Sequence, residues 1–255
     1  MPVLFIGHGS PMNAVLMNDY TGDMTVLGRS LTKPAAILVV SAHWLTNGTY
    51  ITSSEKPLQI YDFYGFPEEL YNIKYPCPGS AAAASSVKQA LSGFGAELTE
   101  KWGIDHAAWT VLKYLFPKAD VPVIELSLDI KKPGRYHYEI GRELKRLREE
   151  NILIIGSGDT VHNLSMMDFS DINAGAYDWA SEFDAKIKAA ILNRDHEKIV
   201  DHSKMGRSAE LSVPTMDHYL PLLYVLGASD DNEAVSFPHE GIQGRSISMM
   251  CVKFG

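Results

Sequence analysis

Short apolar runs bounded by turn residues recur along the chain and predict buried β-strands. Four runs are β-branched and too short for helices: Val3–Ile6, Ala36–Val40, Val121–Leu126 and Ile152–Ile155. The closing segment Ser246–Phe254 alternates well enough to form a further strand. Strands that are continuously apolar are typical of a sheet whose two faces are both covered.

Segments with helical spacing of apolar residues lie between these runs. They are Ser80–Leu91, Ala107–Phe116, Tyr136–Glu150, Tyr177–Leu192 and Tyr219–Leu226. Strands that alternate with helices predict an α/β fold with a central, mostly parallel (mixed) sheet and helices on both faces. No linker, repeat or low-complexity tract divides the sequence, so we expect a single domain over residues 1–255.

The composition and the charge of the chain exclude some classes of protein. Hydrophobic residues make up 45% and charged residues 21% of the 255 residues, which is typical of a globular chain. The formal charge of −8 disfavours binding to nucleic acid. Cys77 and Cys251 are too few for a disulfide framework and suit the reducing cytoplasm. No signal or membrane segment is evident, so we expect a cytoplasmic protein that has no membrane partner.

Histidines follow the predicted strands. Val3–Ile6 leads into Gly7-His8-Gly9-Ser10, Ala36–Val40 into Ser41-Ala42-His43, and Ile152–Ile155 into a Gly- and Ser-containing loop that reaches His162. Ligands of open α/β sheets bind beyond the carboxyl ends of the strands. If the strands are parallel neighbours, the three imidazoles can meet at one edge of the sheet.

Imidazole is the commonest neutral metal ligand, so this edge is a candidate metal site. A further candidate is His218, before a predicted helix that carries Pro221 in its first turn. Asp217 and Asp159 are candidates to orient an imidazole. We expect His106 at a helix N-terminus, which favours a neutral ring.

The remaining histidines and one aromatic segment are less specific. His239 is expected in a loop near the site, and its neighbour Glu240 could supply a carboxylate. His137, His196 and His202 lie in charged contexts and are expected at the surface. The segment Ile60–Pro67 is rich in aromatic residues, and it is either an ordinary packed loop or a wall for an aromatic substrate.

Eight segments occur in an order that resembles the DODA-type extradiol ring-opening dioxygenases. They are GHGSPM, SAHW, YDFYGFPEELYNIKYPCPGS, GIDHAAW, LSLD, GSGDTVHNL, DHYLPLLYVLGA and EGIQGRSISM. This family, the 4,5-DOPA dioxygenase branch, is related to the catalytic subunit of protocatechuate 4,5-dioxygenase. The resemblance extends from residue 2 to residue 254.

The resemblance implies a single divalent metal at the strand ends. It implies His8, His43 and His218 as ligands, with His162 either a further ligand or the acid–base residue, and His106 facing the substrate. The protocatechuate branch uses two histidines and a carboxylate, so Glu240 competes with His218 for the third position. An all-histidine set suits Zn²⁺, which we expect in the isolated protein, whereas ring cleavage requires Fe²⁺.

These features favour a metal-dependent extradiol dioxygenase that opens the ring of a catechol such as DOPA with O2. His162 would act as acid–base residue and His106 would stabilise developing negative charge. Two alternatives remain: a zinc protein that binds aromatic ligands without oxygenating them, and a zinc hydrolase. We expect a monomer or small homo-oligomer.

Overall fold

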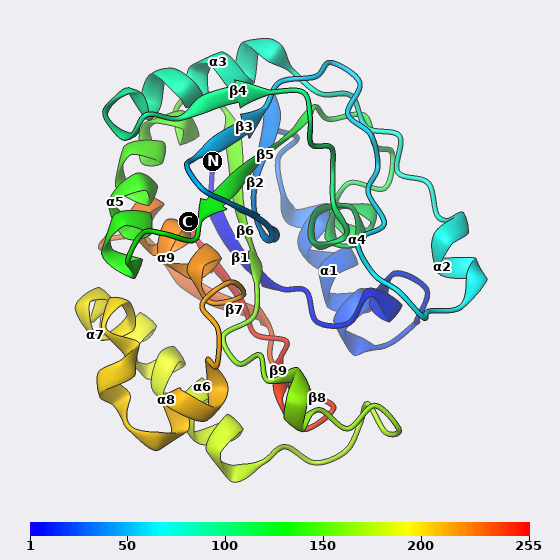
Figure 1. Ribbon diagram of the computed structural model, residues 1–255, viewed down its shortest axis with the longest axis vertical. Helices are drawn as coiled ribbons and strands as arrows, with labels where there is room; N and C mark the ends of the chain where they lie inside the picture. Colours follow the sequence, from blue (N-terminus) through cyan, green and yellow to red (C-terminus); the bar gives the residue numbers. More distant parts are fainter.

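A mixed eight-stranded sheet forms the centre of the computed structural model, which describes residues 1–255 (Figure 1). The strand order is β4-β3-β5-β2-β6-β1-β10-β7. The bounds of these strands are β1 (Val3–Gly7), β2 (Ala36–Thr46), β3 (Tyr50–Thr52), β4 (Glu97–Thr99), β5 (Val123–Asp129), β6 (Ile152–Gly158), β7 (Val235–His239) and β10 (Cys251–Phe254). A separate antiparallel pair consists of β8 (Ile242–Gln243) and β9 (Ile247–Ser248).

The central strands β5, β2, β6 and β1 run parallel to one another. Antiparallel pairings extend this core on both sides: β10 pairs with β1 and β7 with β10 on one side, and β3 pairs with β5 on the other. The observed α/β architecture confirms the expected mostly parallel, mixed sheet. Val3 pairs with Phe254, so the two ends of the chain lie side by side.

Nine α-helices surround the sheet. They are α1 (Asp19–Ser30), α2 (Glu68–Asn72), α3 (Ala81–Ala90), α4 (His106–Leu115), α5 (Gly134–Leu144), α6 (Asp178–Leu192), α7 (His196–Val200), α8 (Arg207–Ser212) and α9 (Leu220–Ala228). Figure 1 shows α5 and α9 on one side of the sheet and α1 and α4 on the other. None of the helices combines the length and the apolarity that crossing a membrane requires.

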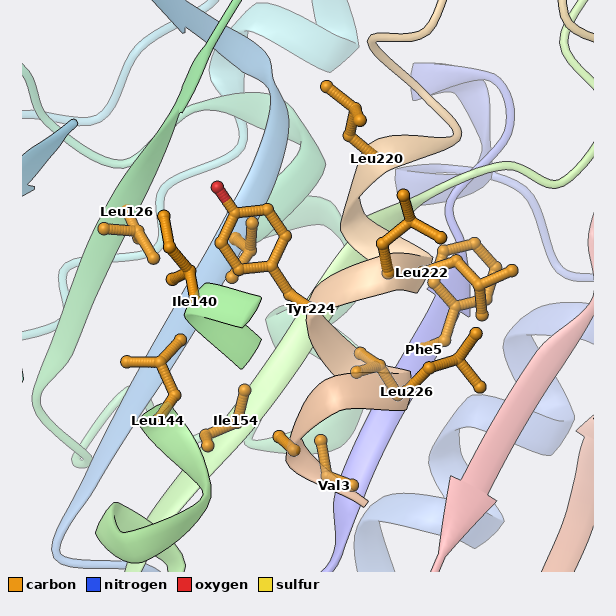
Figure 2. Close-up of a cluster of buried hydrophobic side chains, with 14 of the residues drawn as sticks. Val3, Phe5, Leu126, Ile140, Leu144, Ile154, Leu220, Leu222, Tyr224 and Leu226 are labelled. Atoms are coloured by element: carbon orange, nitrogen blue, oxygen red, sulfur yellow. The ribbon is translucent and has the colours of Figure 1, made fainter. Parts of the chain in front are cut away.

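Alternate residues of the central strands enter two separate hydrophobic cores. Val3 and Phe5 of β1 pack in the core that α5 and α9 cover, where Tyr224 of α9 is fully buried (Figure 2). Leu4 and Ile6 of the same strand belong to the core on the side of α1 and α4. Because side chains alternate between the faces of a strand, this division explains why the run is apolar at every position.

Two predicted strands differ from the observed ones. The strand predicted to end at Val40 continues to Thr46, with a register shift against β5 between Val40 and Leu45. The segment Ser246–Phe254 is not one strand, because its first part pairs with β8 and its last part with β1. The residues around this change of partner, Met249–Val252, are all apolar, so the sequence pattern does not reveal the break.

The prediction that His137 and His196 are surface residues is wrong. His137 is fully buried in α5, where its Nδ1 lies 2.8 Å from the hydroxyl of Tyr224. His196 is 8% exposed and its Nδ1 lies 3.1 Å from the hydroxyl of Tyr138. Buried polar groups need hydrogen-bond partners, and here tyrosines from packed helices supply one for the Nδ1 atom of each ring. Charged neighbours in the sequence do not reveal such tertiary partners.

Candidate metal centre

The structure brings the histidines of separate segments to one edge of the sheet. His8 directly follows β1, and the turn behind it uses Gly9 at φ +58°, a conformation that glycine adopts readily. His43 lies inside β2, His162 follows β6, and His218 precedes α9. Because β2, β6 and β1 are adjacent and parallel, their carboxyl ends open at the same edge.

Three of these rings surround a common point. The ring centroid of His8 lies 5.3 Å from that of His43 and 5.3 Å from that of His218, and the last two are 4.9 Å apart. Imidazoles that bind one tetrahedral ion through nitrogens at about 2.1 Å have centroids roughly 5 Å apart. These centroid separations are compatible with a shared ion, although the sets of ligand atoms that lie within 4.8 Å of one another join His8 and His43 with His106, and His8 and His218 with Asp159.

Each of the three rings has its Nδ1 atom directed at a partner. His8 Nδ1 lies 3.1 Å from Ser157 Oγ, whose hydroxyl donates to the carbonyl oxygen of Ala107 and so can only accept from the ring. His218 Nδ1 lies 2.6 Å from a carboxylate oxygen of Asp217. These partners favour the tautomer with a proton on Nδ1, which leaves Nε2 free to bind a metal.

The carboxylate of Asp62 lies within 3.1 Å of the Nδ1 atoms of two histidines, His43 and His106. Its oxygens lie 3.1 Å from His43 Nδ1 and 3.0 Å from His106 Nδ1, and it also accepts the backbone N–H of His106 at 3.0 Å. Burial raises the pKa of Asp62, but His106 and His43 outweigh that effect and hold the pKa well below its usual value. Asp62 lies within the aromatic segment Ile60–Pro67, but no pattern in the sequence predicted its contact with these histidines.

The electrostatics favour neutral rings at most of these positions. Burial, followed by repulsion from neighbouring histidines, lowers the pKa of His8 well below its usual value and that of His162 to about 2. Burial also lowers the pKa of His218 to about 4, although Asp217 opposes the shift. For His43, by contrast, Asp62 and other carboxylates outweigh burial and raise the pKa. Neutral imidazole is the form that binds metals.

Two features indicate that a cation fits among these residues. The Nε2 atoms of His8 and His43 lie 3.4 Å apart, and in the favoured tautomers neither carries a proton to share. The buried Oδ2 atom of Asp159 has no hydrogen-bond partner and lies 3.8 Å from His8 Nε2. Buried polar atoms without partners are rare. A positive ion would interact favourably with the two Nε2 atoms and with Oδ2 of Asp159.

The ligand atoms of the site form overlapping groups. One group contains His8, His43 and His106, and another contains His8, Asp159 and His218, with the atoms of each group within 4.8 Å of one another. His8 is common to both. His106, at the first position of α4, has its ring centroid only 4.0 Å from that of His43 and 5.7 Å from that of His8. These separations fit a shared ion less well than those of His218.

A cavity of about 320 Å³ opens directly onto the histidines. Its walls combine polar groups of the metal site with apolar side chains, among them Phe63, Phe66 and Ile247. Sites for small molecules have this composition and this size. The aromatic segment therefore lines the cavity, although Tyr61 and Tyr71 pack beside it as part of the core.

His239 and Glu240 lie outside this site. His239 Nδ1 is 2.7 Å from Asp23, and Glu240 pairs with Lys188 at 2.6 Å. Neither residue lines the cavity. Glu240, the expected competitor of His218, lies just after β7 and is paired with Lys188 instead.

The fold and the cluster of histidines define an α/β protein with a candidate metal site that opens into a partly apolar cavity. Residues 26–255 match the model of the catalytic LigB subunit of aromatic ring-opening dioxygenase. The chain therefore belongs to this family, and it is an oxidoreductase of the extradiol dioxygenase class.

Relatives from bacteria and plants cover nearly all of the chain. A protein of Escherichia coli K12 named 4,5-DOPA dioxygenase extradiol is 44% identical over 262 residues, covering 100% of this chain and 95% of its own. A Beta vulgaris protein of the same name is 34% identical, covering 98% and 95%. The crystal structure of an uncharacterized E. coli K12 protein matches with a TM-score of 0.88 at 41% identity and covers 100% of both chains.

Proposed function

We propose that this protein is a metal-dependent extradiol dioxygenase that opens the ring of a catechol such as DOPA with O2. The observation that carries the proposal is the group of three imidazoles whose Nδ1 atoms lie 2.6 to 3.1 Å from an oxygen atom of a neighbouring side chain and which line an aromatic-walled cavity. The names of the relatives in Escherichia coli and Beta vulgaris support the choice of DOPA as the test substrate.

The metal ligands in this proposal are His8, His43 and His218. Their mutual ring separations of 4.9 to 5.3 Å support this set over one that contains His106. An all-histidine site suits Zn²⁺, the ion we expect in the isolated protein, and Fe²⁺ is the ion we expect for ring cleavage. Bound Fe²⁺ would lower the pKa of the diol and would allow electrons to pass from the diol to O2.

His162 is the acid–base residue of the proposal. Its ring lines the cavity, and burial together with His218 lowers its pKa to about 2, so the ring is neutral near pH 7. A neutral ring can accept a proton from the diol and return it as the ring opens. Its place beside, and not among, the three separated rings supports an acid–base role over a ligand role.

His106 faces the substrate in the same cavity. Burial and repulsion from His43 lower its pKa, and the carboxylate of Asp62 opposes this shift. Negative charge on a bound diolate would add to that of Asp62 and favour the protonated ring. The Nε2–H group of that ring can then donate to an oxygen atom that gains charge during ring opening.

The overall reaction breaks the ring bond next to the diol and incorporates both atoms of O2, which yields a muconate semialdehyde.

We propose the cytoplasm as the compartment of the protein, because Cys77 and Cys251 are both buried and unpaired.

The test is anaerobic reconstitution of the metal-free protein with either Fe²⁺ or Zn²⁺, followed by addition of O2 and DOPA. We expect oxygen uptake and a yellow ring-opened product with Fe²⁺ only. Tight binding of Zn²⁺ without oxygen uptake for any catechol in either form would support a zinc protein that binds aromatic ligands. Hydrolysis of an ester by the Zn²⁺ form alone would support a zinc hydrolase.

A further inference from the structure

The carboxyl group of Asp159 lies among the histidines with one of its oxygen atoms unpartnered. Asp159 directly follows β6 and is 1% exposed. Its Oδ1 atom accepts the backbone N–H of Gly9 at 3.0 Å, whereas its buried Oδ2 atom has no hydrogen-bond partner. No lysine or arginine forms an ion pair with it, and the nearest basic atom is His8 Nε2, 3.8 Å from Oδ2. A buried carboxylate without a cationic partner is unfavourable, so Oδ2 requires a positive neighbour.

The ring of His8 does not supply this positive neighbour. Its Nδ1 atom lies 3.1 Å from Ser157 Oγ, which accepts a proton there and leaves Nε2 with a lone pair. A separation of 3.8 Å is also too long for a hydrogen bond from a protonated carboxyl group to Nε2. The Nε2 atom of His43 approaches the same nitrogen to 3.4 Å. Three acceptor atoms therefore converge on one point with no proton between them.

The distances between these atoms fit the coordination sphere of one ion. Two ligand atoms bound at about 2.1 Å lie roughly 3.0 to 4.2 Å apart, depending on the angle between the bonds. The separations of 3.4 Å from His8 to His43 and of 3.8 Å from His8 to Asp159 both fall in this range. The ligand atoms of His8, Asp159 and His218 lie within 4.8 Å of one another. The backbone N–H of Asp159 donates to the carbonyl oxygen of His218 at 2.9 Å, which fixes these two residues relative to each other.

We propose that the Oδ2 atom of Asp159 is a further ligand of the ion in the substrate-free protein, beside the three imidazoles of the proposed function. The inference rests on the metal centre of that proposal and not on its reaction. The N–H of Gly9 holds the other oxygen of the carboxylate, as is typical of carboxylates that bind metals. Ferrous sites of oxygenases commonly combine two histidines with a carboxylate, so Asp159 makes the site suited to Fe²⁺ as well as to Zn²⁺.

Asp159→Asn tests the inference with little change of shape. The amide keeps an oxygen atom for the N–H of Gly9 and removes the charge that faces the ion. The dissociation constant for Zn²⁺ is measured on the metal-free protein in competition with a chelator. We expect the affinity to fall by more than the roughly hundredfold that marks the upper end for residues that only orient a ligand.

Two other aspartates provide matched comparisons. Asp217 orients His218 through its Nδ1 atom at 2.6 Å, so Asp217→Asn should cost only about tenfold to a hundredfold in Zn²⁺ affinity. Asp184 accepts from Thr160 and Ser248 and contacts no histidine of the site. Asp184→Asn should therefore leave the affinity for Zn²⁺ unchanged.

The stability of the metal-free protein separates a ligand from a residue with a merely structural role. In the wild type, Oδ2 of Asp159 and Nε2 of His8 are both acceptors, whereas the amide of Asp159→Asn can direct an N–H group at His8. We expect the metal-free variant to be at least as stable in urea as the wild type. Added Zn²⁺ should raise its Tm by less than that of the wild type, because it binds more weakly. Lower stability without metal, together with an unchanged effect of Zn²⁺, would overturn the inference.

The visible absorption of the Co²⁺-loaded protein reports the number and type of the ligands. We expect Asp159→Asn to change the positions and intensities of the bands and Asp217→Asn to retain them. An unchanged spectrum of Asp159→Asn, with or without weaker binding, would show that Asp159 acts from outside the coordination sphere and would overturn the inference.

The two proposals fail in different ways. If the wild type binds Zn²⁺ and Asp159→Asn binds it equally well, the inference on Asp159 fails and the proposed function stands. If the variant loses affinity and changes its Co²⁺ spectrum but no catechol consumes O2 with the Fe²⁺-loaded wild type, Asp159 is a ligand and the dioxygenase proposal fails. A wild type that binds neither Zn²⁺ nor Co²⁺ would overturn both.

Discussion

The imidazole rings of His162 and His218 are stacked, with centroids 3.5 Å apart and planes inclined by 5°. Burial lowers the pKa of His162 most, and the nearby His218 adds to this effect because two protonated rings would repel each other in this arrangement. The stack places the proposed metal ligand His218 against the proposed acid–base residue His162. Substitution of each residue can separate their roles.

We predict that His162→Ala retains metal and loses turnover. Removal of a general acid–base residue typically lowers kcat by about a hundredfold to ten-thousandfold. Metal content is measured by elemental analysis and kcat by oxygen uptake. His8→Ala is the comparison, because it should lose the metal itself. Loss of metal in both variants would make His162 a ligand and leave the base unidentified.

The ligand set is tested by comparing His218→Ala with His106→Ala. The separations of the rings predict that the first variant loses bound metal and that the second keeps it but binds or turns over the catechol more weakly. The measurement is the dissociation constant for Zn²⁺ in competition with a chelator. The opposite order would move the ion to the group formed by His8, His43 and His106.

Asp62→Asn should weaken both the binding of metal and the turnover of substrate. An amide cannot accept from two imidazoles through two carboxylate oxygens, so His43 and His106 lose their common anchor. Loss of a residue that orients a ligand typically costs about tenfold to a hundredfold in metal affinity or activity. Asp23→Asn is the matched control, because Asp23 holds His239 outside the cavity. Equal effects of the two substitutions would count against a special role for Asp62.

Gly158→Ala should disturb the site through the backbone. A Cβ atom at this position would lie 2.2 Å from the carbonyl oxygen of His218, so the segment that carries His218 must move. We expect weaker metal binding with little change in the secondary structure seen by circular dichroism. Gly175→Ala is the control, since no atom lies within 4 Å of a Cβ atom there. Unchanged metal affinity of Gly158→Ala would show that the segment adjusts without cost.

Acid should destabilise the protein partly through His137. Burial lowers the pKa of this histidine to about 4, below its usual value of 6.5. Below pH 6.5 the unfolded chain gains a proton that the folded one does not, so stability falls as the pH decreases from 6.5 towards 4. The contribution is on the order of 3 kcal/mol. Urea denaturation of the metal-free protein should show that His137→Gln loses less stability than the wild type over this range. Equal losses would contradict a buried, neutral His137.

Much of the fold follows from local patterns in the sequence. The β-branched runs marked the four central parallel strands because both of their faces are buried, and each face requires apolar residues. The edge strands β4 and β7 and the short strand β3 beside β4 were not predicted, because three to five residues carry little periodicity.

The site could be predicted only in part. The histidines after β1 and β6 were found because small residues separate a buried strand from an imidazole. Asp62 was missed because its role depends on two histidines that lie 19 and 44 residues away in the sequence. His137 was misplaced for the same reason, since Tyr224, which hydrogen-bonds it, lies in another helix.

The proposed ligands come from the beginning, the first fifth and the last fifth of the chain, and they meet only after β1, β2 and α9 have docked against β6. An ion bound there would link segments that are far apart in the sequence and would therefore close long loops of polypeptide. Metal binding should therefore be coupled to the cooperative unfolding of the whole sheet. Proteolysis would then become markedly faster once a chelator has removed the ion.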